Sequence, residues 1–184
     1  LASVESEACP LDLAPTSSTT VALVLGDALA IAVLEARGFT AEEFAFSHPG
    51  GALGKRLLLR VSDVMVVEED IPSVTPSAAV AEALYEITRK GLGMTTVSNH
   101  DGKLAGVFTD GDLRRVVEEK ADLQDTNVAQ VMTKSAKTIP PETLAAEAMS
   151  LMERHGISSL VAVDESQRIS GVVTLLSLLK AGIS

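Results

Sequence analysis

The sequence predicts an α/β (α+β) protein built from two copies of a β-α-β-β-α unit, which follow a separate helical segment. The main observation is a junction that occurs twice. Gly106–Leu113 has the pattern of a strand that runs into a helix, and the same outline returns 65 residues later at Gly171–Leu178. Internal repeats of this kind decide the fold before any single element does.

The repeat extends well beyond the junction. At the same offset, Pro76 matches Pro141 and Gly91 matches Gly156. Upstream the offset becomes 67, where Val61–Met65 matches Val128–Met132. Residues 61–119 and 128–182 are therefore two copies of one unit, and everything before Leu57 lies outside the repeat.

Each copy predicts the same order of elements. Apolar periodicity and turn residues give the first copy a short extended piece near Ser73-Val74, a helix over Ser77–Lys90, strands over Met94–Val97 and Leu104–Phe108, and a helix over Asp112–Glu119. The second copy predicts a helix over Glu142–His155, strands over Ser159–Val163 and Ile169–Val173, and a helix over Leu175–Ala181. One copy is too small to bury both faces of its sheet, so we expect the two to pack together.

The segment before the repeats contains a helix that is apolar nearly all round. It follows the capping residues Pro15–Thr20 and runs over Val21–Arg37. Such a helix must be buried on most sides, yet the segment is too small to bury it. Thr40 and Glu43 form a capping box that opens a second helix. Ser47–Lys55 then predicts a constrained turn, in which His48 is either a loop residue or a general acid or base.

Composition limits the function. The net charge of −10 argues against a nucleic-acid polymer as partner, although one local pocket can still bind a single nucleotide. A single cysteine excludes an intrachain disulfide and fits a reducing compartment. The longest uncharged run, Leu13–Gly26, is shorter than the roughly 20 residues that span a bilayer. We therefore expect a cytoplasmic protein with no membrane partner, and Leu1 indicates that the sequence begins inside a longer chain.

The repeated junction suggests an anion and ribose site, with one alternative left open. Backbone N–H groups at the helix start and the Thr109 hydroxyl suit a phosphate, and the Asp112 carboxylate suits a ribose diol. The same Thr109–Asp112 spacing is also a capping box that needs no ligand. Arg114 suits either phosphate or solvent. The second junction keeps Thr174 but has Leu175 and Ser177, so we expect one main site at the first junction.

The segment before the repeats resembles the closing portion of the sugar isomerase (SIS) domain of D-arabinose 5-phosphate isomerases. The resemblance rests on motifs at family spacing: Glu7–Leu11, Leu13–Thr20, Gly26–Ala30 and Ser47–Gly54. It implies an aldose–ketose isomerase that interconverts D-ribulose 5-phosphate and D-arabinose 5-phosphate for synthesis of the lipopolysaccharide sugar Kdo. Glu7 and His48 match proposed catalytic positions. The family's serine-rich phosphate loop, catalytic lysine and a further glutamate have no counterpart here, so we expect this chain alone to be inactive.

The last 125 or so residues resemble a tandem pair of CBS domains, a Bateman module. The marks are the Val-Met near each start, the glycine that closes the first helix and the Gly-apolar-apolar-Thr junction. The domains expected are a SIS remnant and linker at 1–56, a first CBS domain at 57–123 and a second at 124–184. The resemblance implies a nucleotide in the cleft between the copies, and the predicted contacts are Met65, Met94, Thr95, Thr109, Asp110, Asp112, Arg114 and Thr174.

The two resemblances predict a regulatory, ligand-sensing CBS pair attached to a sugar phosphate isomerase. The candidate ligand is CMP-Kdo, the activated end product of the implied pathway. The alternative is a pair that acts only in oligomerisation, without ligand. We expect at least a dimer, no required cofactor beyond a regulatory nucleotide or CMP-sugar, and no metal, because no Cys, His and Asp cluster has ligand spacing.

Overall fold

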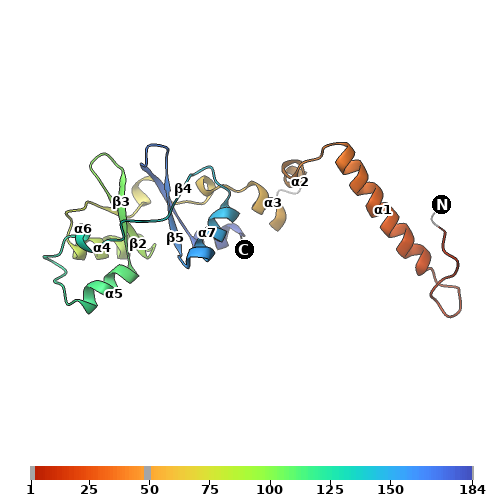
Figure 1. The fold of residues 1–184 in the computed structure, drawn as a ribbon, viewed down its shortest axis with the longest axis horizontal. Coiled ribbons are helices and arrows are strands. Elements are labelled where there is room, and N and C mark those ends of the chain that lie inside the picture. The colour runs from red at the N-terminus through yellow and green to blue at the C-terminus, as the bar shows by residue number, and fades with distance from the viewer. Residues whose placement is uncertain (1–2, 48–50, 184) are drawn as a thin grey trace. The chain divides into compact units, whose positions relative to one another are not determined.

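The structure is a computed structural model that describes residues 3–47 and 51–183. The chain separates into two compact units, Leu1–Ser47 and His48–Ser184, and each is described by itself (Figure 1). The domain boundaries predicted from the sequence, at residues 56/57 and 123/124, stay predictions. In space, the second unit contains both repeats and the helix before them.

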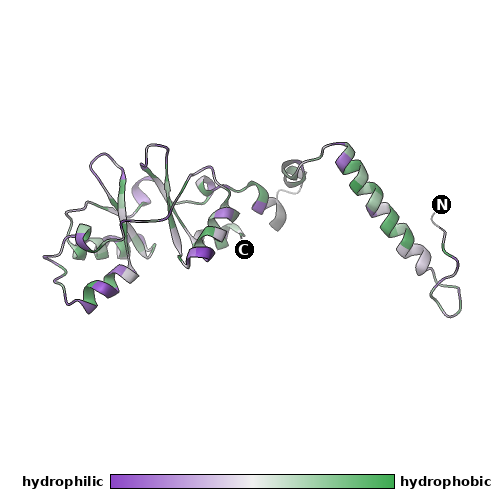
Figure 2. Cartoon of the chain, in the orientation of Figure 1, coloured by the Kyte–Doolittle hydropathy of each residue, from purple (hydrophilic) through white to green (hydrophobic). Residues whose placement is uncertain are grey.

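The first unit consists of two helices, α1 (Ser17–Ala36) and α2 (Ala41–Ser47). The predicted capping box at α2 is confirmed, because the Thr40 N–H donates to Glu43 Oε2 (3.0 Å) and the Glu43 N–H donates to Thr40 Oγ1 (3.2 Å). No residue of α1 is buried. Figure 2 shows apolar residues along most of this helix beyond its first turn. The expected mismatch is therefore present: the helix is apolar, yet none of its residues is buried.

Helix α1 is longer than the uncharged run predicted. Asp27 does not end it, and its 20 residues are long and apolar enough to cross a membrane by length and composition. The uncharged run Leu13–Gly26 is shorter than this helix, so the run alone did not indicate the helix's full apolar length. The same test is passed by core helices of soluble proteins, so it does not by itself indicate a membrane protein.

The second unit opens with a helix that the sequence analysis missed, α3 (Ala52–Leu58). We expected a turn through Lys55, but Gly51 in extended conformation begins a helix directly after the Pro-Gly-Gly sequence. Helix α3 packs against α7 (Ala145–His155). Two short 3-10 turns, η1 (Val61–Asp63) and η2 (Glu68–Asp70), lead from α3 into the first sheet.

The two repeats form two three-stranded sheets of identical topology, which confirms the β-α-β-β-α prediction. The first sheet has the order β1-β2-β3, with β1 parallel to β2 and β2 antiparallel to β3; the second has the order β4-β5-β6 with the same directions. The first repeat comprises β1 (Ser73–Val74), α4 (Val80–Lys90), β2 (Met94–Ser98), β3 (Leu104–Thr109) and α5 (Asp110–Glu118). The second comprises α6 (Val128–Val131), β4 (Thr138–Ile139), α7, β5 (Ser159–Val163), β6 (Ile169–Thr174) and α8 (Leu175–Ala181).

The first helix of each repeat begins three residues later than predicted. In the first repeat, the carbonyls of Pro76 and Ala78 accept hydrogen bonds from the backbone of Ala129 and Val128. In the second, the carbonyls of Pro141 and Thr143 accept from Ser62 and Val61. The expected first turn of each helix is extended because its backbone pairs with the opening segment of the other repeat.

The opening segments are exchanged between the repeats. Val61 and Met65 pack in the core of the second repeat with Leu160 and Leu178, whereas Val128 and Met132 pack in the core of the first. Each structural core is therefore completed by a segment that the sequence assigns to the other copy. Neither repeat can form its full core alone.

Glycine at the start of the junction motif follows from this exchange. A β-carbon on Gly106 would lie 2.7 Å from the carbonyl oxygen of Thr133, and one on Gly171 would lie 2.7 Å from that of Val66. Backbone bridges join Val107 to Thr133 and Val66 to Val172 at these points. The exchanged segment thus crosses each sheet at a place where only glycine fits.

The sheets meet in a third apolar cluster. Its buried members come from both repeats: Met94, Val107, Val161, Val163 and Val172. The hairpin turns also join, since Leu104 N–H donates to Gln167 O (3.1 Å) and Ile169 N–H donates to Gly102 O (3.2 Å). The two repeats therefore pack into one unit. We call the interface between their two sheets the joint.

Candidate functional site

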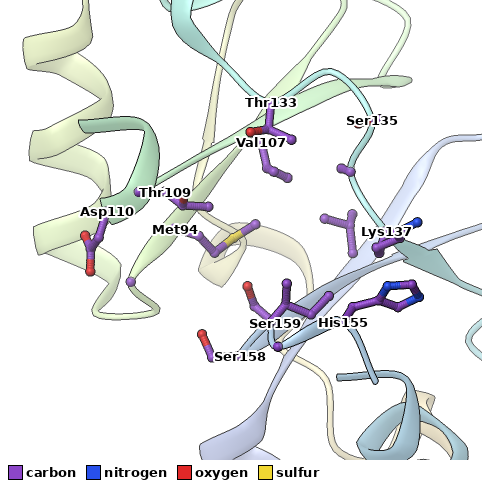
Figure 3. Close-up of a pocket in the computed structure, with 16 residues that line it drawn as sticks. Met94, Val107, Thr109, Asp110, Thr133, Ser135, Lys137, His155, Ser158 and Ser159 are labelled. Carbon is purple, nitrogen blue, oxygen red and sulfur yellow. The ribbon is translucent and has the colours of Figure 1, made fainter. Parts of the chain in front are cut away.

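A cavity of about 450 Å³ lies at the joint between the repeats (Figure 3). This volume falls in the range typical of small-molecule sites, roughly 300–1,000 Å³. The first repeat supplies Gly93, Met94, Val107, Thr109, Asp110 and Gly111. The second repeat supplies Thr133, Ser135, Ala136 and Lys137 from its opening segment, and His155, Gly156, Ile157, Ser158, Ser159 and Val161 from the end of α7 and from β5. The cavity thus combines an apolar floor with hydroxyl groups and charges of both signs.

The junction of β3 and α5 forms one wall of the cavity. Thr109 is the N-cap of α5 in extended conformation, and Asp110 and Gly111 follow it in the first turn. The Thr109 N–H and hydroxyl both donate to Asp112 Oδ2, at 2.8 and 2.7 Å. The capping interpretation of the Thr109–Asp112 spacing is therefore realised in the structure.

Asp112 lies behind this wall and is 1% exposed. Its Oδ1 accepts a hydrogen bond from the Thr133 hydroxyl (2.7 Å) and forms an ion pair with Arg115. Both carboxylate oxygens are thus occupied by protein groups. In this arrangement Asp112 positions two residues of the cavity wall, Thr109 and Thr133, instead of lining the cavity itself, so its predicted contact with a ribose requires one of these partners to be displaced.

Two basic side chains that were not predicted as site residues line the cavity. Lys137 precedes β4, and His155 is the last residue of α7. Both are exposed, and in Figure 3 their side chains lie on the same side of the cavity, away from Asp110. His155 was interpreted only as a cation at a helix C-terminus. Its position beside Gly156, which has φ of 62° and ends the helix, was the signal that placed it at the joint.

The structure brings together some of the predicted contacts and separates others. Met94, Thr109 and Asp110 line the cavity, and the Met94 side chain lies between the labelled residues of the two repeats (Figure 3). The lining does not include Met65, Thr95, Asp112, Arg114 or Thr174. Met65 packs against the core of the second repeat, Thr95 is fully buried, and Arg114 is exposed on α5. Thr174 caps α8 at the other junction.

The predicted catalytic pair is only partly described. His48 lies outside the described residues. Glu7 Oε2 accepts hydrogen bonds from the Thr16 N–H (2.6 Å), the Thr16 hydroxyl (3.1 Å) and the Ser18 N–H (3.3 Å) at the start of α1. Hydrogen bonds from Ser18 and from the Thr16 backbone lower the pKa of Glu7 from 4.5 to about 2. Glu7 is therefore ionised near neutral pH, in a state that can accept a proton but not donate one.

A metal site has no ligand set in the described part of the chain. No group of three or more His, Cys, Asp or Glu residues is placed there to hold an ion. The charged side chains of the cavity, Asp110, Lys137 and His155, are suited to hydrogen bonds with a polar organic ligand.

Comparisons with known proteins agree with this architecture. The CBS domain family matches residues 61–119 and 128–184. Among solved structures, CBSX2 in complex with AMP has a TM-score of 0.60 at 25% identity and covers 67% of this chain and 95% of its own. An uncharacterized conserved protein from Pyrococcus horikoshii has a TM-score of 0.58 at 29% identity, with coverages of 67% and 91%.

Curated relatives cover the segment before the repeats as well. Arabinose 5-phosphate isomerase KdsD of Pseudomonas aeruginosa is 60% identical over 182 residues, which are 99% of this chain and 56% of that protein. KdsD of Escherichia coli K12 is 51% identical over 180 residues, with coverages of 98% and 55%. The chain therefore spans about half the length of the curated relatives it matches. It belongs to the CBS domain family, as a tandem CBS pair that follows a segment similar to arabinose 5-phosphate isomerases.

Proposed function

We propose that the CBS pair is a regulatory module that binds a nucleotide or nucleotide sugar in the cavity at the joint. The observation that carries the proposal is the grouping of Thr109 and Asp110 from the first repeat with Lys137 and His155 from the second, around one cavity of ligand size. Similarity to the AMP complex of CBSX2 supports a nucleotide as the class of ligand.

The distribution of charge suggests how a nucleotide would lie. Asp110 and Asp112 make the first turn of α5 acidic, which disfavours a phosphate at that helix N-terminus despite its free N–H groups. Asp110 and Thr109 suit the hydroxyls of a ribose instead. Lys137 and His155 suit the phosphate on the other side, and Met94, Val107 and Val161 offer an apolar surface for the base.

The complete protein is proposed to be a cytoplasmic sugar phosphate isomerase that converts D-ribulose 5-phosphate and D-arabinose 5-phosphate. The names of the curated relatives, and their identities of 60% and 51% over alignments that cover nearly the whole chain, support this activity. In that reaction Glu7, which is ionised, would accept a proton, and His48 would be its partner. Assay of this chain beside a full-length relative tests the expectation that the chain alone does not isomerise either sugar.

Calorimetric titration of the chain with AMP, ATP, CMP and CMP-Kdo tests the binding site and the identity of the ligand. Lys137→Met should weaken binding about tenfold or more, because a hydrogen bond to a charged group is worth roughly 1.5–3 kcal/mol. Lys134→Met is the matched control, since Lys134 is an exposed lysine on the same segment outside the cavity lining. Equal affinity of the two variants would refute the site, and binding of adenine nucleotides alone would refute CMP-Kdo.

A role in self-association is the second candidate. The helices that follow the two junctions expose large apolar side chains, with Val117 on α5 and Leu176 and Leu179 on α8 each at least half exposed. Such side chains suit a contact between CBS pairs of two chains. Sedimentation of the wild type and of Leu176→Glu, with and without nucleotide, tests whether this surface forms a dimer. An unchanged molecular mass in the variant would exclude it.

A further inference from the structure

The pseudo-symmetry of the pair defines a second cleft that corresponds to the cavity. At the offset of 65, Thr174 takes the place of Thr109, Leu175 that of Asp110 and Lys90 that of His155. The short segment before β1, which contains Asp70, takes the place of the segment around Ser135. The second cleft therefore has the same backbone frame and different side chains.

Lys90 is the residue of the first repeat that matches His155 of the second. It is the last residue of α4, and its ammonium donates a hydrogen bond to the carbonyl oxygen of Glu69 in η2. The same ammonium lies 3.5 Å from Asp70 Oδ1, and the Lys90 side chain is only 11% exposed. This contact ties the end of α4 to η2, the loop that forms the far side of the second cleft.

The junction on the other side of the second cleft is also unsuited to a ribose. Leu175 and Leu176 replace Asp110 and Gly111, which removes the carboxylate and adds bulk. The Thr174 hydroxyl accepts a hydrogen bond from the Ser177 N–H (3.1 Å) within its own cap. By this matching of positions, the second cleft would have a paired lysine and an apolar junction at the places where the first has an open cavity.

We propose that Lys90 is the internal occupant of the second cleft, and that the chain consequently binds one nucleotide, in the cavity of the first junction. This inference rests on the proposed nucleotide-binding function. It assigns Lys90 as a residue that sets the stoichiometry of binding, through its contacts with Glu69 and Asp70.

Calorimetry with AMP on a matched pair of cap variants tests the stoichiometry. Thr109→Val and Thr174→Val each remove the N-cap hydroxyl of the helix after a junction. Because Thr109 also donates to the buried Asp112, circular dichroism first checks that both variants are folded. The wild type and Thr174→Val should bind one AMP per chain, and Thr109→Val should lose binding at least about tenfold. Two AMP per chain in the wild type, or loss of binding in Thr174→Val, would overturn the proposal while leaving nucleotide binding intact.

Chemical labelling of lysines without nucleotide tests the Lys90 contact independently of ligand binding. With limiting acetic anhydride and mass spectrometry, Lys90 should react at least about threefold more slowly than the exposed Lys137, because its ammonium is paired and shielded. Asp70→Asn should raise the rate at Lys90 and leave Lys137 unchanged. If neither the wild type nor any variant binds AMP, ATP, CMP or CMP-Kdo, the proposed function fails; if Lys90 reacts as fast as Lys137, the internal occupant is refuted.

Discussion

Replacement of Gly106 by alanine should destabilise the CBS pair strongly, although it adds only one methyl group. The new β-carbon would lie 2.7 Å from Thr133 O and 2.9 Å from Met132 Sδ. The methionine side chain can move aside. The carbonyl cannot, because it accepts from the Val107 N–H (3.0 Å) while the Thr133 N–H donates to Val107 O (2.9 Å).

The expected cost is about 2–4 kcal/mol. Overpacking of a tight core site costs roughly 1–3 kcal/mol, and loss of one bridging hydrogen bond adds about 1 kcal/mol. Gly111→Ala is the matched control. A β-carbon on Gly111 would have only Thr109 Oγ1 nearby, at 3.6 Å, which is an ordinary contact distance. Alanine at this position should therefore stabilise α5 by up to about 1 kcal/mol.

Urea unfolding followed by far-ultraviolet circular dichroism measures both variants, since the chain has no tryptophan. With a urea dependence of about 1–3 kcal/mol per molar, Gly106→Ala should lower the midpoint by about 1 M or more, and Gly111→Ala should not lower it. Equal midpoints for the two variants would show that the exchanged segment does not cross the sheet at Gly106.

Three further outcomes follow from the same contacts. Asp112→Ala should cost about 2–4 kcal/mol in urea unfolding, because it removes a buried cap and leaves its hydroxyl and cationic partners unsatisfied. Ser177→Ala, at the matching position of the second repeat, should cost only about 1 kcal/mol, and a similar loss in both variants would contradict the special role of Asp112. Because the pKa of Glu7 is lowered to about 2, its stabilisation of the α1 start is present above pH 4.5 and is lost as the pH falls from 4.5 through about 2. Carboxyl NMR titration should follow this change. Ser18→Ala should raise the pKa of Glu7, because it removes the largest of the interactions that lower it, and an unchanged value would refute the hydrogen bonds as its cause.

The elements of the repeats were predictable because their signals are local. The strand over Ser159–Val163 and the helix over Leu175–Ala181 have the predicted bounds, and both Gly91 and Gly156 end helices with positive φ. The late starts of α4 and α7 were not predictable, because the backbone there pairs with a segment about 50–80 residues away in sequence. Periodicity along one stretch contains no information on such a partner.

The site was predictable at the junction and not across the joint. Thr109 and Asp110 belong to a motif that repeats, so their sequence alone pointed to them. Lys137 and His155 reach the cavity only through the packing of the second repeat on the first. The sequence left two roles open for Asp112, a contact with a ribose or a helix cap. The hydrogen bonds that it accepts from Thr109 and Thr133 show that the cap is formed.

Comparison of matching positions separates the residues that the fold needs from those that a ligand would need. Gly106 and Gly171 are both retained, and each is crossed by the exchanged segment of the other repeat. The N-cap threonines are retained too. The repeats differ at positions that would contact a ligand: Asp110 of the first repeat corresponds to Leu175 of the second. A duplication kept only for assembly has no reason to preserve an open, charged cavity at one junction, and a duplication with two equal sites has no reason to close the other. The asymmetry supports the proposal of one ligand-binding cleft, to which the second repeat contributes Lys137 and His155.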